Sequence, residues 1–318
     1  MKKSTTLGHS TLEINRIGLG CMGMSEFYGS FDESESIHTL HKAIDLGVNF
    51  YDTADMYGWG ANEKLLGKAF KGKWNDIVLA TKFAVMRGPN GEFLGINGKP
   101  EYIRKACETS LQNLGVEAID LYYMHRKDPE VPIEDIVGTM SELVKEGKVK
   151  YLGLSEVDPE TLRKANAVHP ITALQTEYSL WSREPEDELF ATCKDTGTTF
   201  VAYSPLGRGF LTGAIKSRAD FEPGDFRLHN PRFTEEAIQQ NLQFVEVVEQ
   251  IAQSKGVSKA QVALAWILSQ NDEITTIPGT RKIHRLEENL GAFNVELTAE
   301  DMATIDANVP DSTVGARY

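Results

Sequence analysis

The stretch Val48-Asn49-Phe50-Tyr51-Asp52-Thr53-Ala54-Asp55-Met56-Tyr57-Gly58 changes from mostly apolar to mostly polar residues after Tyr51. Its first four residues predict a buried β-strand, and the polar residues begin where that strand ends. The same order recurs along the chain, as a short apolar run, a polar or glycine-rich loop and then an amphipathic helical pattern. This alternation predicts parallel strands joined by helices.

Eight apolar runs are each predicted to form a strand. They cover residues 16–20, 48–51, 77–80, 119–124, 149–154, 171–174, 199–203 and 274–277. The helices predicted to follow them cover residues 33–46, 62–70, 100–115, 132–146, 158–167, 186–196 and 282–292. Eight units in 318 residues predict one α/β domain, residues 1–318, folded as a closed (β/α)8 TIM barrel rather than an open doubly wound sheet.

Several segments depart from the repeated unit. Residues 5–17 alternate loosely and predict an N-terminal β-hairpin that caps one end of the barrel. A long loop at residues 204–234 follows the seventh strand, and two helices, at 234–254 and 258–269, precede the eighth. A second glycine-rich loop is predicted at 83–100, and the tail from residue 293 shows one helical pattern, at 299–307, and then no periodicity. Loops this long inside a compact domain are usually functional.

Composition narrows the class of protein. The chain is 41% hydrophobic and 25% charged, and no apolar run approaches the ~18 residues that span a membrane. The first residues are followed by no hydrophobic segment, so we expect no signal peptide. The three cysteines, Cys21, Cys107 and Cys193, show no CxxC spacing, which favours a reducing, cytoplasmic compartment over disulfides or a metal site. A net charge of −13 disfavours nucleic acid and anionic membranes as partners.

The residues at the predicted strand ends suggest a site, because active sites of such barrels lie at the carboxyl ends of the strands. Those residues are Asp52, Lys82, His125, Ser155, Gln175, Tyr203, Ser204 and Thr280. Tyr57 follows shortly after the first of them. A tyrosine has a reference pKa of about 10 and is a weak acid at neutral pH, but a nearby ammonium stabilises its phenolate. Lys82 can supply that charge, Asp52 can hold Lys82, and His125 can donate to a substrate oxygen. The set therefore suits delivery of a proton to a developing alkoxide.

Each of these four residues also has an ordinary structural interpretation. An aspartate at a strand end can be a cap, a lysine can be solvated, a histidine can bond within the rim, and a tyrosine can pack against a helix. Taken singly, these interpretations are favoured for Asp52, Lys82, His125 and Tyr57. Because the four residues come from three consecutive strand ends, we favour a shared site.

Several motifs are specific in combination. They are Asp52-Thr53-Ala54-x-x-Tyr57-Gly58, Thr81-Lys82, Tyr122-Tyr123-Met124-His125, Gly58-x-Gly60-x-Asn62-Glu63, Gly153-Leu154-Ser155, Gln175-Thr176-Glu177-Tyr178-Ser179, Tyr203-Ser204-Pro205-Leu206-Gly207-Arg208-Gly209 and Ile277-Pro278-Gly279-Thr280. On these motifs the whole chain, including the initial hairpin, resembles the aldo-keto reductase superfamily. The long loop after the seventh strand resembles its prokaryotic and plant branch more than the mammalian aldose reductases.

The resemblance implies an oxidoreductase of the NADP-dependent alcohol dehydrogenase or aldehyde reductase type, reducing aldehydes or ketones with NADPH. It implies Tyr57 as the acid, Lys82 and Asp52 as the residues that tune it, and His125 as the residue that orients the carbonyl. The cofactor-binding residues expected from it are Gly20, Met22, Asp52, Ser155, Gln175, Tyr203, Ser204, Pro205, Leu206, Arg208, Gly209, Gly279, Thr280, Arg281, Arg285, Glu288 and Asn289.

Within that set, the nicotinamide is expected to stack on Tyr203, with its carboxamide held by Ser155 and Gln175. Arg208 and Gly209 are expected to close over the pyrophosphate. One position departs from the family pattern, because Glu156 stands where an asparagine commonly follows the serine. An ionised carboxylate cannot donate to a carboxamide oxygen, so the role of this position is open.

Two stretches compete as the phosphate site. Gly18-Leu19-Gly20-Cys21-Met22-Gly23 matches GxGxxG, but no helical pattern opens at the third glycine and the next strand-end acid lies beyond the usual spacing. We therefore expect these glycines to let the end of the first strand pass close to a ligand. Gly279–Arg285 is the better candidate, because a helix is predicted to start there and helix N-termini bind phosphate. Arg281 and Arg285, four residues apart, are expected to share a helix face and to bind the 2′-phosphate of NADPH.

Other functions stay open on sequence grounds. A cofactor-binding regulatory module, similar to the potassium-channel β subunits, is the main alternative; the complete set of four residues and the lack of an extended N-terminal segment favour the enzyme. A phosphate-metabolising barrel isomerase would need a catalytic carboxylate that cannot be assigned. The substrate is expected to be a small carbonyl compound whose identity depends on loops 24–31, 83–100 and 205–234 and on the tail. The aromatic and apolar residues expected near it are Met24, Phe27, Tyr28, Trp59, Phe83 and Trp181. The sequence leaves the oligomeric state undetermined.

Overall fold

Eight parallel strands form the centre of the computed structural model, which describes residues 1–88, 90–310 and 312–317. The strands are β3 (Leu19–Gly20), β4 (Phe50–Asp52), β5 (Val78–Phe83), β8 (Ile119–Met124), β9 (Val149–Ser155), β10 (Ala173–Glu177), β11 (Thr199–Tyr203) and β12 (Thr275–Thr276). Each is hydrogen-bonded to the next in this order, and bridges between Ile17 and Thr276 and between Gly20 and Gly279 join the two edges. The predicted closed (β/α)8 barrel is confirmed.

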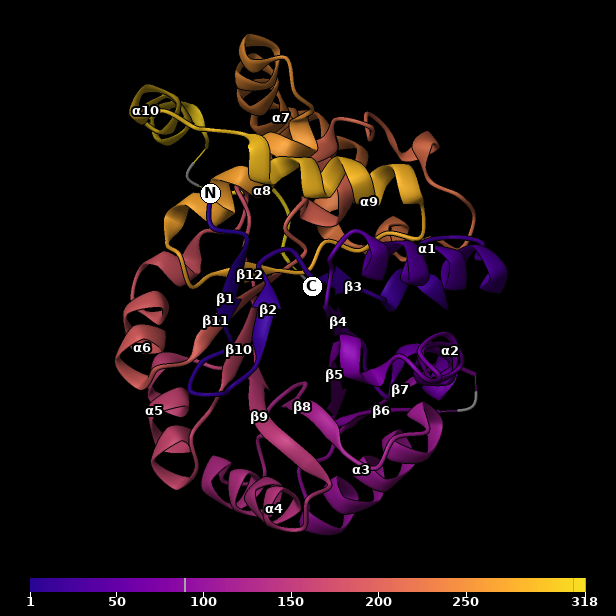
Figure 1. Cartoon of the computed structure of the whole chain (residues 1–318). Coiled ribbons are helices and arrows are strands. Elements are labelled where there is room, and N and C mark those ends of the chain that lie inside the picture. Colours follow the sequence, from indigo (N-terminus) through magenta and orange to yellow (C-terminus); the bar gives the residue numbers. More distant parts are fainter. Residues whose placement is uncertain (89, 311, 318) are drawn as a thin grey trace.

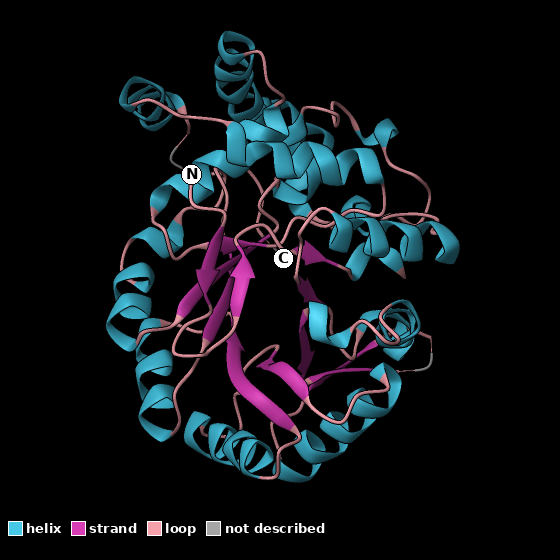
Figure 2. Ribbon diagram, viewed as in Figure 1, coloured by secondary structure: helices cyan, strands magenta, loops and turns pink. Residues whose placement is uncertain are grey.

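Helices surround this sheet, as Figures 1 and 2 show, with the strands inside and the helices outside. They are α1 (Glu33–Asp45), α2 (Ala61–Ala69), α3 (Pro100–Leu114), α4 (Ile133–Lys145), α5 (Pro159–Val168), α6 (Leu189–Thr196), α7 (Glu235–Lys255), α8 (Lys259–Gln270), α9 (Ile283–Leu290) and α10 (Ala299–Asn308). Side chains cap the starts of several of these helices, and at α5 the side chain of Asp158 accepts a hydrogen bond from the Thr161 amide. Ser258 and Thr298 form capping boxes at α8 and α10.

The interior of the barrel is a packed core in which side chains alternate along each strand. A buried cluster fills it, with members that include Phe50, Val78, Ala80, Leu121, Tyr123, Ala173 and Val201. The intervening residues, such as Tyr51, Leu79 and Leu174, pack outward against the helices. Gly153 of β9 leaves room for this packing, because a Cβ there would lie 2.4 Å from the Tyr123 ring. The sequence of each strand thus determines which residues face the barrel axis.

The predicted N-terminal hairpin is confirmed and lies at one end of the barrel. Its strands, β1 (Ser4–Thr6) and β2 (Glu13–Asn15), pair antiparallel. Leu7 and Ile14 from this hairpin are fully buried and belong to the same interior cluster as the strand residues. The hairpin therefore closes the end of the barrel with apolar side chains, as expected from the sequence.

The segment 83–100 differs from its prediction as a glycine-rich loop. It contains a second antiparallel hairpin, formed by β6 (Val85–Arg87) and β7 (Phe93–Ile96). Two short apolar runs flanking a Gly- and Asn-containing turn are a hairpin pattern that the sequence interpretation did not use. Strand bounds also shift, since β10 begins two residues later than predicted and β5 extends to Phe83. As expected, the GxGxxG stretch opens no long helix, because only a 3-10 turn, Met22–Met24, follows β3.

The chain after α10 returns to the long loop that follows β11. The side chain of Asn241 in α7 bonds both the carbonyl and the amide of Val314, at 3.0 and 2.9 Å. Residues 204–234 contain several 3-10 turns rather than one unstructured loop. Across the described ranges, no helix has both the length and the apolar composition needed to cross a bilayer.

Candidate active site

The strand-end residues share a face of the barrel because of their spacing. Asp52 stands two residues after the core residue Phe50, and Lys82 two residues after Ala80. His125 likewise follows Tyr123 by two positions, directly after β8 ends. Side chains two residues apart point to the same face of a strand. The sequence therefore places polar groups directly above the apolar interior of the barrel.

Lys82 is completely buried and is held by the last residue of β4 and the residue that follows it. Its ammonium forms an ion pair with Asp52 and donates to the carbonyl of Thr53 at 2.8 Å. The second carboxylate oxygen of Asp52 accepts a hydrogen bond from the side-chain amide of Gln175 at 2.7 Å. Three strands of the barrel, β4, β5 and β10, are thus linked through one carboxylate, as the predicted support of Lys82 by Asp52 requires.

Tyr57 and His125 lie next to this ion pair. The Lys82 ammonium lies 5.3 Å from the centroid of the Tyr57 ring. The rings of Tyr57 and His125 meet edge to face, with centroids 5.9 Å apart. Both side chains line the same cavity although each residue is less than a tenth exposed. The four residues predicted to act together are therefore together in the structure.

Burial governs the charge state of this cluster. It raises the pKa of Asp52 and lowers the pKa of Lys82, while their mutual attraction opposes both shifts. Burial, followed by the charges of Lys82 and Arg126, lowers the pKa of His125 well below its usual value. The imidazole is therefore neutral at physiological pH and can donate from one ring nitrogen. Its Nδ1 atom is buried and has no hydrogen-bond partner among the residues that the structure describes.

Asn62 and Glu63, at the start of α2, act as structural supports. The Asn62 amide accepts from the Thr53 hydroxyl at 2.6 Å and donates to the carbonyl of Cys21 at 2.8 Å. Glu63 accepts from the hydroxyl of Thr81, next to Lys82, at 2.7 Å. These buried bonds tie the start of α2 to the ends of β4 and β5, so they fix the backbone on either side of Tyr57.

One elongated cavity of about 1270 Å³ lies above the cluster. All of the residues predicted to bind cofactor line it, from Ser155, Gln175 and Tyr203 near the cluster to Glu288 and Asn289 on α9. Of the four predicted catalytic residues, Asp52, Tyr57 and His125 line it, and Lys82 lies behind them. The described residues contain no cluster of His, Cys, Asp or Glu side chains suited to a metal ion.

At the far end of the cavity, the prediction that Arg281 and Arg285 share a helix face is wrong. Helix α9 begins at Ile283, so Arg281 lies before it and does not share a helix face with Arg285. Arg281 instead donates to the carbonyls of Gly23 and Tyr28, both at 3.1 Å, and Arg285 pairs with Glu288 at 2.8 Å. Thr280 accepts a hydrogen bond from the amide of Lys282 at 3.0 Å, which turns the chain into the helix later than expected. We call Arg281, Lys282 and Arg285 the basic corner; all three line the cavity.

The apolar wall of the cavity differs from the predicted set. Phe27 and Tyr28 line it, but Met24, Phe83 and Trp181 are buried in the core behind it, and Trp59 is 42% exposed outside the lining. The structure adds Met56, Val85, Phe93, Ile96 and Phe226. Of these, Val85, Phe93 and Ile96 come from the unpredicted β6–β7 hairpin, which is why the sequence interpretation missed them.

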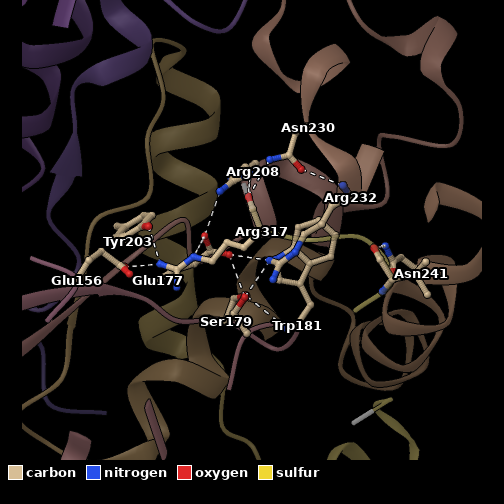
Figure 3. A network of polar contacts seen from close by, with 12 residues as sticks. Glu156, Glu177, Ser179, Trp181, Tyr203, Arg208, Asn230, Arg232, Asn241 and Arg317 are labelled. Atoms are coloured by element: carbon tan, nitrogen blue, oxygen red, sulfur yellow. Dashed lines mark hydrogen bonds and ion pairs between the residues drawn. The ribbon is translucent and has the colours of Figure 1, made fainter. Parts of the chain in front are cut away.

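Of the charged residues near the cavity, Arg126 and Arg317 were missed, the role of Glu156 was left open, and Arg208 was predicted. Arg126 lines the cavity and donates to the Ser155 hydroxyl at 3.2 Å. Glu156 has a left-handed backbone (φ 56°), accepts from the Glu177 amide at 3.0 Å and pairs with Arg317. Arg208 lines the cavity, but its guanidinium faces Glu177 at 3.2 Å (Figure 3). No sequence pattern could connect Arg317 to positions 156 and 177, because the contact arises from the path of the tail.

Comparisons with known proteins agree with this geometry. Residues 16–309 match the model of the aldo/keto reductase family. The chain is 44% identical over 318 residues to the protein "aldo-keto reductase yakc [NADP(+)]" of Schizosaccharomyces pombe. The match covers 98% of this chain and 93% of that one. It is 45% identical to the probable aldo-keto reductase 1 of Glycine max, covering 98% and 90%. A solved glycerol dehydrogenase from Gluconobacter oxydans superposes with a TM-score of 0.88 at 27% identity, over 99% of both chains.

Proposed function

Because the chain belongs to the aldo/keto reductase family, and is thus an oxidoreductase, we propose that it reduces aldehydes and ketones to alcohols with NADPH. The observation that carries the proposal is the buried group of Tyr57, Lys82, Asp52 and His125 at one end of an elongated cavity. Reduction of a carbonyl needs a proton on its oxygen, and a phenol beside a buried ammonium can supply one.

The proposed roles follow from the contacts. Tyr57 donates its proton to the carbonyl oxygen and becomes a phenolate, which the charge of Lys82 stabilises. Asp52 holds Lys82 in place and prevents it from moving toward solvent. His125, neutral and next to Tyr57, donates a hydrogen bond to the same oxygen and fixes its position.

The residues around the cavity fit a dinucleotide phosphate. NADPH supplies the hydride when it is bound. Tyr203 offers a ring for the nicotinamide, while Ser155 and Gln175 offer a hydroxyl and an amide at the same end. The basic corner lies at the other end, where Arg285 can exchange Glu288 for a phosphate. In a protein with a net charge of −13, such a local group of cations is what an anionic cofactor needs.

The substrate side of the cavity favours apolar carbonyl compounds. Phe27, Met56, Val85 and Phe226 line it near Tyr57. Phe27 meets the ring of Tyr57 edge to face at 6.4 Å, so an apolar group of a substrate would pack beside the proposed acid. We propose medium-sized aromatic or aliphatic aldehydes and ketones as substrates.

The test is oxidation of NADPH, followed at 340 nm, with a panel of aliphatic and aromatic aldehydes and ketones. We expect aldehyde-dependent oxidation that Tyr57→Phe abolishes. Tight binding of NADPH with no turnover of any carbonyl would instead support a cofactor-binding regulatory module. Failure to bind NADPH at all would contradict both interpretations.

A further inference from the structure

The C-terminal segment, residues 312–317, reaches the cavity through Arg317. Figure 3 shows the Arg317 guanidinium at the centre of a polar network that also contains Glu156, Glu177 and Tyr203. Its Nε donates to Glu177 at 3.0 Å, and one terminal nitrogen pairs with Glu156 and donates to the Tyr203 hydroxyl at 2.7 Å. One side chain thus bonds the carboxylates of two strand ends and the ring predicted to carry the nicotinamide.

The segment is placed by contacts that a loosely attached tail would lack. The buried side chain of Asn241 bonds the backbone of Val314 on both its amide and its carbonyl. Gly315 has φ 93°, and a Cβ there would lie 2.5 Å from the carbonyl oxygen of Pro231. A larger residue at 315 would therefore clash with the long loop after β11. These contacts fix the backbone at residues 314 and 315 independently of the Arg317 side chain.

Arg317 also connects to that loop through its own backbone. Its carbonyl accepts from Arg208 at 3.2 Å and from the side chain of Asn230 at 2.9 Å, and both of those residues line the cavity. Glu177 is fully buried and forms ion pairs with Arg208 and Arg232 as well as with Arg317. The tail, the long loop and the ends of β9, β10 and β11 are therefore joined in one charged network.

We propose that Arg317 is a positioning residue of the cofactor site, which orients Tyr203 for the nicotinamide and fixes Arg208 for the pyrophosphate. The inference rests on the proposed function, because it takes Tyr203 as the nicotinamide platform. It also assigns Glu156, at the position where an asparagine was expected, as the acceptor that aims the guanidinium at Tyr203. An arginine suits this role because its planar guanidinium can donate to several acceptors at once. The ammonium of a lysine does this less well.

The test is titration of Arg317→Met, Arg317→Lys and wild-type protein with NADPH and NADH, followed by fluorescence. Loss of charge-assisted bonds predicts that Arg317→Met raises Kd by ~10-fold for both cofactors alike, since they share the nicotinamide half. Arg317→Lys is expected to lose less, and the NADPH KM is expected to rise more than kcat falls. Arg183→Met is the matched control, because Arg183 ties the tail through Asp306 in α10 but is not part of the described cavity lining.

The outcomes separate this inference from the proposed function. Wild-type affinity in Arg317→Met would contradict the inference alone, and tighter binding would show that Arg317 covers the site rather than supports it. Restoration of affinity on adding Glu156→Gln to Arg317→Met would also contradict it, because charge neutralisation would then explain the effect. A wild-type protein that binds neither cofactor would contradict the proposed function and this inference together. A single cooperative melting transition well above the assay temperature confirms that each variant is folded.

Discussion

The two ends of the cavity hold their charges in different ways. At the strand ends, Lys82 is wholly buried and pairs with Asp52, which is bonded in turn by Gln175. In the basic corner, Lys282 and Arg285 have side chains about half exposed, and each pairs with an acidic neighbour that is itself partly exposed. The first arrangement belongs to the barrel core and the second to the surface of a loop and a helix start.

This difference predicts different energetic consequences. A buried charge whose partner is removed is costly, because the low-dielectric interior offers no water in its place. An exposed pair contributes little, since solvent screens it and can replace either partner. The strand-end cluster is therefore preorganised and intolerant of change. The basic corner can release its present partners in exchange for a phosphate, and it should affect binding more than folding.

Tyr57→Phe should give the largest effect of the changes considered. It removes the proposed proton donor and keeps the ring that packs against His125. We expect kcat to fall by at least ~10²-fold, with little change in NADPH affinity. Tyr151→Phe is a matched control, because that hydroxyl bonds Thr11 at the hairpin end of the barrel. Reduction of aldehydes by Tyr57→Phe at near wild-type rates would remove the acid assignment.

Lys82→Met tests whether the loss of one partner from the buried Lys82–Asp52 ion pair costs more stability than the loss of one from an exposed pair. Leaving Asp52 uncompensated should lower the free energy of unfolding by about 3–5 kcal/mol, measured by urea denaturation. Lys150→Met, which breaks the surface pair with Asp120, should lower it by less than about 1 kcal/mol. Equal losses in the two variants would end the contrast between buried and exposed pairs.

Asp52→Asn sharpens the same comparison by its effect on catalysis. It should slow reduction less than Lys82→Met does, because Asp52 acts on Tyr57 only through Lys82. Steady-state kcat with one aldehyde measures both variants. A greater loss in Asp52→Asn would show that its bond to Gln175 matters more for catalysis than its bond to Lys82.

The barrel and the strand-end cluster could be predicted because their causes are local. Alternating core residues and a polar residue two positions later, as in Ala80 and Lys82, set both the strand and the direction of its last side chain. Parallel order then brings β4, β5 and β8 side by side, so the cluster follows from the order of the chain. The cavity lining from β11 and α9 came from motif resemblance instead.

The errors have non-local causes. Arg281 lies before the helix start at Ile283 and bonds the carbonyls of Gly23 and Tyr28, contacts that no local pattern reveals. The β6–β7 hairpin was obscured by its glycines, which a loop and a turn use equally. The contact of Arg317 with Glu156 and Glu177 depends on the path of a tail without periodicity. Each of these features requires the tertiary structure.

Arg285→Ala tests the basic corner with a smaller expected effect. Loss of one charge-assisted bond to a 2′-phosphate predicts a ~10-fold higher Kd for NADPH and no change for NADH. The present pair with Glu288 must break on binding, which is why we expect no more than this. Lys42→Ala is the control. Lys42 pairs with Glu287, which lies on α9 like Arg285, and neither Lys42 nor Glu287 is part of the described cavity lining. Equal losses for both cofactors would assign Arg285 to the fold or the pyrophosphate.

The pH dependence of His125 gives the smallest effect and completes the comparison. Its pKa is held well below 6.5 by burial and by the charges of Lys82 and Arg126, whereas in the unfolded chain it is about 6.5. Below that pH the unfolded state therefore binds a proton that the folded state does not, so stability falls as pH falls. Relative to His125→Asn, the wild type should lose roughly 1 kcal/mol of stability between about pH 7.5 and about pH 6.

Urea denaturation of both proteins at the two pH values measures this difference. The other titrating groups are common to wild type and variant and cancel, including Asp52, whose raised pKa changes stability in the opposite direction. The same neutral ring predicts that kcat/KM for reduction shows no inflection near pH 6.5. Parallel stability curves for the two proteins would mean that His125 is protonated as readily in the fold as in water. The strand-end cluster would then accommodate a second cation as easily as the exposed corner does, and the contrast between the two regions would no longer hold.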